Sequence, residues 1–212
     1  MDKERRPGLT RKYLLAVFAF AFLIRIPLLL GPERPMDGDE CSIAVMARHI
    51  AFEHEFPMGF YGSDYGAGQA LIAYTAAPFF KIFGPSDIFI NGISAAASAL
   101  LCALVAMFAA AALGNSSGIA AGIILAALPP FIKASFQVNA YIETLCVCII
   151  LAHVFFFKVL TAETGEQKTT WVFAFSILSG AALWCFEFSA LFIAPLAVFA
   201  IFNARRFRLV HV

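Results

Sequence analysis

Three stretches of this sequence are apolar enough and long enough to cross a lipid bilayer as helices. They are Tyr13–Leu30, interrupted only by Arg25, then Ile88–Leu113 and Val138–Phe157. Spanning the hydrocarbon core takes about 20 apolar residues in helical conformation. The composition agrees, because 61% of the residues are hydrophobic and 14% are charged, whereas a soluble domain is about half apolar and about a quarter charged. The sequence therefore predicts an all-α integral membrane protein.

Two later stretches complete the predicted bundle. Ile119–Ile132 ends in Pro129-Pro130, and Trp171–Phe202 carries Glu187 near its middle. As one helix, Trp171–Phe202 would be roughly 48 Å long against a hydrocarbon core of about 30 Å, so two short helices turning near Glu187 fit better. Residues 1–212 are thus expected to form one polytopic module with a long loop over 31–87 and with six spans, near 13–30, 88–113, 117–133, 138–158, 171–186 and 188–203.

The lysine and arginine residues indicate how the bundle is oriented, because short cytoplasmic loops carry an excess of them. With six spans both termini are cytoplasmic, and the loop over 31–87 lies on the extracytoplasmic side. A cleaved signal peptide is the competing interpretation of the N-terminus, but Tyr13–Leu30 is longer than such a segment and no small-residue cleavage site follows it. The net charge of +1 gives no indication of nucleic-acid binding. The residues assigned to the cytoplasmic side are Lys3, Arg5, Arg6, Arg11, Lys12, Lys158, Lys168, Arg205, Arg206 and Arg208.

The loop over 31–87 contains two segments with helical patterns. In Cys41–His54 the apolar residues recur at the spacing of one helix face, which predicts a helix resting on the membrane surface. Gly66–Phe83 is apolar but includes Gln69 and Tyr74. We interpret it as a second surface helix, with a full span as the alternative.

Two acidic residues, Asp39 and Glu40, stand where the first surface helix is expected to begin. One interpretation is structural, because aspartate is a favoured helix N-cap and acids suit the positive end of a helix. The other is that they form a catalytic base or, together with Asp37, ligands for a divalent metal ion. The sequence leaves both interpretations open.

Other polar residues are expected at the same membrane face. Ionisable side chains at membrane depth are rare and usually functional, and tyrosines stack on sugars or sit among lipid headgroups. Arg25 either reaches the outer surface or pairs with an acid inside the bundle, and Glu143 is expected to face the bundle interior. The candidates for substrate binding are Asp37, Arg34, Arg48, Tyr61, Tyr65, Lys133, Tyr141 and Glu143.

Several short motifs follow one another along the chain. They are Leu23-Ile24-Arg25-Ile26-Pro27, Gly38-Asp39-Glu40, Ala47-Arg48-His49-Ile50, the aromatic and glycine-rich run over 60–68, Asn139-Ala140-Tyr141-Ile142-Glu143 and Gly180-Ala181-Ala182-Leu183-Trp184. In this order they resemble the N-terminal half of GT-C membrane glycosyltransferases, in the branch of the protein O-mannosyltransferases and the lipid A aminoarabinose transferases. The strongest motif is the Asp-Glu pair in the first outer loop.

The resemblance implies an inverting enzyme that moves a sugar from a polyprenyl-phosphate carrier to an acceptor hydroxyl on the extracytoplasmic side. Asp39 matches the position of the family's proposed base, and Glu40 lies beside it. A carboxylate within hydrogen-bond reach of the attacking hydroxyl can accept its proton. The phosphate of the leaving group needs positive charge or a metal ion nearby.

Two departures from the family pattern bear on this expectation. A lysine and an arginine found in many relatives are absent here, which leaves the phosphate-binding cation among Arg34, Arg48, Lys81 and Lys133. Relatives are also about twice as long, so we expect either an incomplete chain or a second subunit. The partners implied are membrane lipid and the lipid-linked donor, with no nucleic acid. The alternative function is a non-catalytic membrane subunit or carrier that handles a lipid-linked substrate.

Overall fold

The computed structural model describes residues 9–31, 38–61, 70–136 and 140–202, and within these ranges it contains helices and no strands. The elements are α1 Arg11–Leu23, α2 Ile26–Leu29, α3 Gly38–Arg48, η1 His49–Glu53, α4 Ala70–Phe83, α5 Asp87–Leu113, α6 Asn115–Ala127, α7 Pro129–Ala134, α8 Ala140–Thr161, α9 Gly165–Cys185, η2 Glu187–Ser189 and α10 Ala190–Phe202.

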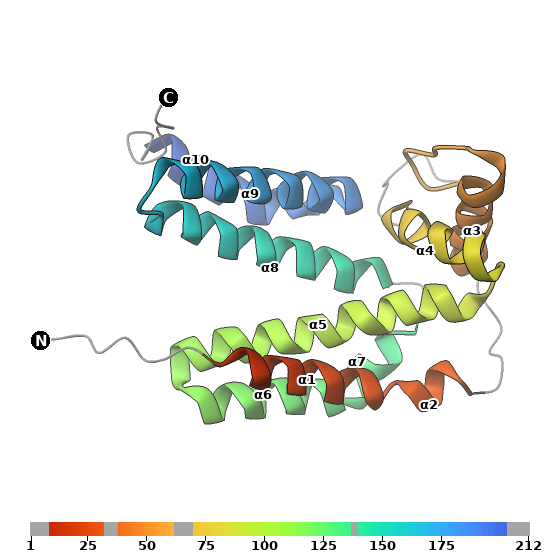
Figure 1. Cartoon of the computed structure of the whole chain (residues 1–212), viewed down its shortest axis with the longest axis horizontal. Coiled ribbons are helices and arrows are strands. Elements are labelled where there is room, and N and C mark those ends of the chain that lie inside the picture. Colours follow the sequence, from red (N-terminus) through yellow and green to blue (C-terminus); the bar gives the residue numbers. More distant parts are fainter. Residues whose placement is uncertain (1–8, 32–37, 62–69, 137–139, 203–212) are drawn as a thin grey trace, which may run out of the picture.

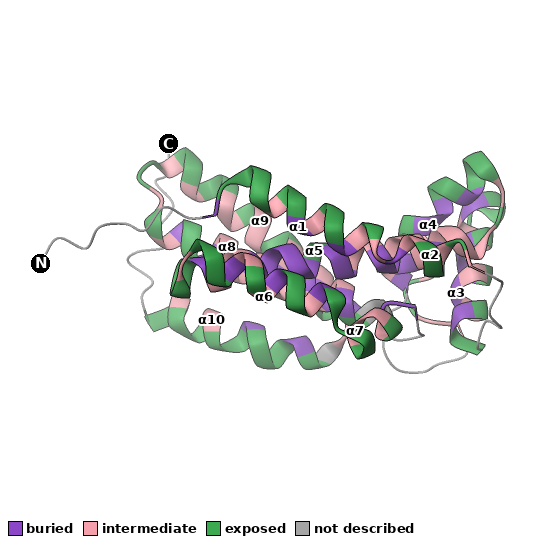
Figure 2. Cartoon of the chain, turned by 90° about the horizontal axis from the view of Figure 1, so that it is seen from below, coloured by how far each residue is buried: buried purple, intermediate pink, exposed green. Residues whose placement is uncertain are grey.

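The long helices lie side by side in a bundle (Figure 1). Helices α1, α5 and α6 pack together, α8 packs on α9 and on α10, and α5 packs against α8 to join the two groups. Helices α3 and α4 pack on each other and on α5 at one end of the bundle, which we call the loop end. Helix α1 begins and α10 ends at the opposite end. Buried residues line the inner faces, while α10 is largely exposed (Figure 2).

The helix lengths and apolarity confirm a helical membrane bundle. Three segments are long and apolar enough to cross a membrane, namely Arg11–Leu29, Asp87–Leu113 and Ile142–Thr161, and α4, α6 and α10 are shorter apolar helices. The total of six spans stays a prediction. Helix α4 has 14 residues and is about 21 Å long at 1.5 Å per residue, which suits the expected surface position.

A proline breaks the first predicted span. Pro27 has no backbone N–H with which to bond the carbonyl of Leu23, and α1 ends at Leu23. The span predicted over Tyr13–Leu30 is confirmed as an apolar segment, Arg11–Leu29, that is long enough to cross a membrane, and a short turn at Ile24 and Arg25 separates α1 from α2 within it.

Two other breaks agree with the sequence. Leu128 is extended, with ψ of 115°, as is usual for a residue that precedes a proline, and it separates α6 from α7. In the last apolar stretch, α9 ends at Cys185 and the η2 turn precedes α10. The predicted pair of helices turning near Glu187 is confirmed.

Helix α6 approaches α5 closely through two glycines one turn apart. A Cβ atom on Gly118 would lie 2.5 Å from the carbonyl oxygen of Ala106 and 2.5 Å from Cβ of Ala110, and one on Gly122 would lie 2.8 Å from Cγ1 of Val17. Small residues at such spacing let membrane helices pack backbone to backbone. This contact fixes α6 against both α5 and α1.

We expect Gly118→Val to destabilise the bundle, because the added side chain would overlap backbone and Cβ atoms of α5. Overpacking of this kind typically costs about 1–3 kcal/mol. The control is Gly180→Val, since a Cβ at Gly180 meets nothing within 4 Å. Thermal unfolding in detergent should show a lower midpoint for the first variant only, and equal midpoints would contradict the close contact.

Arg25 is fully buried, at 0% exposure, beside the break between α1 and α2. Its Nε donates a hydrogen bond of 2.9 Å to Oγ of Ser135, and its Nη1 donates one of 2.6 Å to the carbonyl oxygen of Ala21. The guanidinium carbon lies 5.3 Å from the centroid of the Phe131 ring. The alternative in which Arg25 reaches the outer surface is therefore wrong.

Glu143 supplies the opposite charge from the start of α8. Its side chain is 3% exposed, and it attracts the Arg25 guanidinium electrostatically. Among the described residues, Oε2 of Glu143 and Nη2 of Arg25 have no hydrogen-bond partner. Since an isolated charge in an apolar bundle is costly, the electrostatic attraction between these two buried groups favours both charges. The expected burial of Glu143 is confirmed.

Removing one charge should destabilise the protein more than removing both. Glu143→Leu leaves Arg25 buried without its opposite charge, an effect of about 3–5 kcal/mol in comparable cases. The double variant Arg25→Met with Glu143→Leu removes both charges and should recover much of the loss. Thermal unfolding in detergent measures this, and strictly additive losses would contradict the pairing.

Candidate functional site

The first turn of α3 presents two carboxylates at the loop end. Asp39 is exposed, whereas Glu40 is buried at 4% exposure on the same face as Ile43 and Ala47. This face packs against α4. Glu40 is therefore held by the fold, while Asp39 beside it is accessible, and an acid in a first helical turn is also favoured by the helix dipole.

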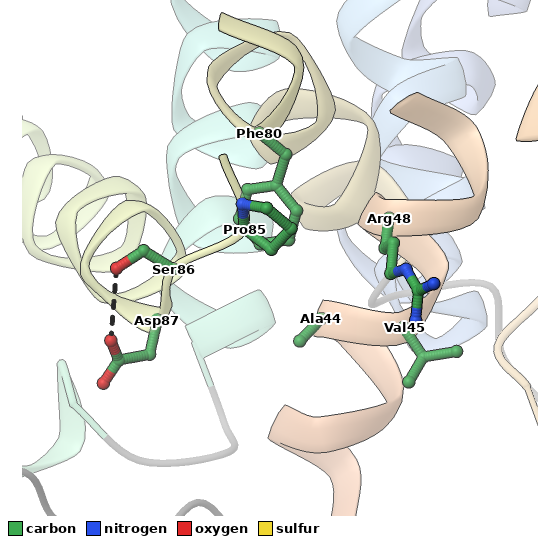
Figure 3. A pocket seen from close by; sticks show the side chains of 7 residues that line it. All are labelled: Ala44, Val45, Arg48, Phe80, Pro85, Ser86 and Asp87. Carbon is green, nitrogen blue, oxygen red and sulfur yellow. Dashed lines mark hydrogen bonds between the residues drawn. The ribbon is translucent and has the colours of Figure 1, made fainter. Parts of the chain in front are cut away.

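Arg48 lies at the other end of α3, beside a shallow cavity of about 250 Å³ (Figure 3). The cavity lies between α3 and the junction of α4 with α5. Its wall is mostly apolar, with Arg48 and the Ser86–Asp87 start of α5 supplying the polar groups. The side chain of Ser86 accepts a hydrogen bond from the backbone N–H of Ile88 and so caps α5. The lining residues are Ala44, Val45, Arg48, Phe80, Pro85, Ser86 and Asp87.

The structure places Asp39 and Arg48 on one helix but does not bring them together. Nine residues of α-helix correspond to about 13 Å. Nine residues also turn the two side chains about 180° apart around the helix axis, so they project from opposite faces of α3 and do not line one ligand position.

Tyr61 contacts neither Asp39 nor Arg48. Its hydroxyl donates a hydrogen bond of 2.6 Å to Oε2 of Glu55 and lies 3.1 Å from Nδ1 of His49. The bond to the Glu55 carboxylate, with some burial, raises the pKa of Tyr61 to about 12. This tyrosine belongs to a separate polar cluster that follows α3.

The remaining predicted site residues are spread over the loop end or lie outside the description. Lys133 is exposed on α7, whereas Glu143 is buried and faces Arg25. Tyr141 lies in the first turn of α8, and its side chain is outside the described residues. The others outside them are Arg34, Asp37 and Tyr65. Their roles in substrate binding stay predictions.

One group of candidate ligands was missed at the sequence level. His49, Glu53 and Glu55 converge after α3, away from the metal position hypothesised near Asp37, Asp39 and Glu40. The spacing of His49 and Glu53 at i and i+4 is a signal that the sequence did contain. The position of Glu55 depends on a chain reversal at His54, which the sequence does not specify.

Comparison with known proteins identifies the family. The model of the dolichyl-phosphate-mannose-protein mannosyltransferase family matches residues 70–212, from α4 to the end of the chain. Asp39, Glu40 and Arg48 precede the matched range. No curated protein and no solved structure gives a significant match. The match covers more than half of the chain, which therefore belongs to the dolichyl-phosphate-mannose-protein mannosyltransferase family, within the GT-C superfamily of membrane glycosyltransferases.

Proposed function

We propose that the protein transfers a sugar from a polyprenyl-phosphate-linked donor to an acceptor hydroxyl at the extracytoplasmic membrane face. The family match over residues 70–212 carries the proposal. The accessible carboxylate of Asp39 at the loop end supports it, because transfer to a hydroxyl requires a proton acceptor.

In the proposed reaction the acceptor oxygen attacks the anomeric carbon while the bond from that carbon to the phosphate oxygen breaks. Asp39 takes the hydroxyl proton, and the polyprenyl phosphate leaves with the bonding electrons. Glu40, held in the packed face of α3, supports Asp39. A divalent metal near these acids is a further element of the proposal, which removal of metal with a chelator tests.

The leaving phosphate needs a positive group, and Arg48 is the candidate that adjoins a cavity. Its mostly apolar wall suits the first part of a lipid chain, and the guanidinium can bind a phosphate with two parallel hydrogen bonds. Lys81 and Lys133 are exposed and adjoin no described cavity.

The topology behind this proposal can be tested with reporter fusions. We expect fusions near Ser116 and Gly165 to report a cytoplasmic location, and fusions near Tyr61 and Ala134 to report an extracytoplasmic one. The reason is the excess of Lys and Arg in the segments at the end of the bundle where α1 begins. A Gly165 fusion that reports the outside would separate the residues that we assign to one face.

Asp39→Asn should reduce sugar transfer by about 10²–10⁴-fold, the usual loss when a general base is removed, at normal membrane levels. Asparagine caps helices about as well as aspartate, so stability should not change. Transfer of label from polyprenyl-phosphate mannose in membranes measures the rate. Glu40→Gln should be milder.

The matched control is Glu166→Gln, which alters another acid in a first helical turn, at the start of α9. It should leave transfer unchanged. Near-normal transfer by Asp39→Asn, with Asp39→Ala lowering only protein levels, would make Asp39 a helix cap. No transfer by the unaltered protein with any donor would favour the non-catalytic subunit.

A further inference from the structure

A cluster of residues of metal-binding types lies directly after the C-terminal end of α3. The helix continues into the π-helical turn η1, which contains His49 and Glu53. His54 then adopts a left-handed conformation, with φ of 57°, and the chain turns back. The backbone N–H of Glu55 donates to the carbonyl oxygen of His49 at 3.4 Å. This reversal places Glu55 against the imidazole.

The three side chains are close enough to share one ion. One ligand atom from each of His49, Glu53 and Glu55 lies within 4.8 Å of the others. Nδ1 of His49 is 3.4 Å from Oε2 of Glu55, and Nε2 is 3.8 Å from Oε1 of Glu53. Around a tetrahedral zinc ion, bonds of about 2.0–2.2 Å put neighbouring ligand atoms roughly 3.3 Å apart. The two distances involve opposite nitrogens of the imidazole, and an ion binds only one of them. Binding therefore requires one exposed glutamate side chain to rotate toward the nitrogen that holds the ion.

The charges in the cluster also favour a cation. Two carboxylates face one imidazole, and in the described part of the chain no lysine or arginine pairs with Glu53 or Glu55. The side chains of the two glutamates are 46% and 52% exposed, and that of His49 is 26% exposed. The site is thus open enough for an ion to enter, and its histidine is partly held by the fold.

The segment carrying the cluster is attached to the bundle. Nε1 of Trp184, in α9, donates a hydrogen bond of 2.8 Å to the carbonyl oxygen of Met58. The Trp184 ring lies 5.8 Å from that of Tyr74 in α4, and the His49 ring lies 5.6 Å from that of Tyr61. An ion bound here would join the end of α3 to a segment that α9 already holds.

We propose that His49, Glu53 and Glu55 form a zinc site in which Tyr61 supports the imidazole and the Glu55 carboxylate. One nitrogen and two oxygen ligands match the mixed histidine and carboxylate sets that zinc accepts, with a position left for water. The proposal does not depend on the transferase activity. The competing arrangement has no metal and keeps the contacts of His49 with Tyr61, Glu53 and Glu55 as they are.

The test measures zinc bound by the whole chain, purified in detergent with a tag free of histidine and treated with a chelator. All variants carry Cys41→Ser, because Cys41 is an exposed thiol that also binds zinc. Titration calorimetry with zinc chloride should give about one ion per chain. His49→Gln and Glu55→Gln should each weaken binding by at least about 10-fold, while the neighbouring His54→Asn should bind like its parent.

Thermal unfolding provides a second readout. Zinc should raise the midpoint of the parent and of His54→Asn but not that of His49→Gln. Because Glu55 is half exposed, Glu55→Gln is expected to fold normally, so its loss of binding cannot be attributed to misfolding. No stoichiometric binding by the parent, or undiminished binding by Glu55→Gln, would overturn the proposal and favour the arrangement without a metal.

Discussion

The charge of Arg25 inside an apolar bundle constrains how the helices around it are arranged. An uncompensated guanidinium is costly in such surroundings, and here residues from several elements interact with it. Ser135 follows α7, Phe131 lies in α7, Ala21 lies in α1 and Glu143 opens α8. Removing one member of a buried pair of opposite charges is strongly destabilising, whereas replacing both by apolar side chains is often neutral or stabilising.

The loop end is built differently, from a surface helix packed on α4. Its buried residues Glu40, Ile43 and Ala47 leave Asp39 on the accessible side, while Arg48 faces the cavity farther along. The carboxylate and the guanidinium are thus two separate charged positions on α3, at different ends and on different faces of the helix.

The helical bundle could be predicted because its information is local. Apolar length, proline positions and the excess length of Trp171–Phe202 each act within one segment. The sequence could not decide whether the Arg25 side chain reaches the membrane surface or stays inside the bundle, because this depends on which side chains other helices bring near it. The cluster at His49 was missed for a related reason. It requires a π-turn and a left-handed residue, His54, and neither has a strong sequence signal.

The break before Pro27 couples the backbone hydrogen bonds of α1 to the position of the Arg25 side chain. In an unbroken helix the carbonyl of Ala21 would accept the backbone N–H of Arg25. Here that N–H bonds Phe22 instead, and the carbonyl of Ala21 receives the Arg25 guanidinium. The turn at Ile24 and Arg25, next to Pro27, thus leaves the carbonyl of Ala21 to the Arg25 side chain. If the helix continued without a break, the backbone N–H of Arg25 and its guanidinium would compete for the carbonyl oxygen of Ala21. The guanidinium would then be held in a different position relative to Glu143.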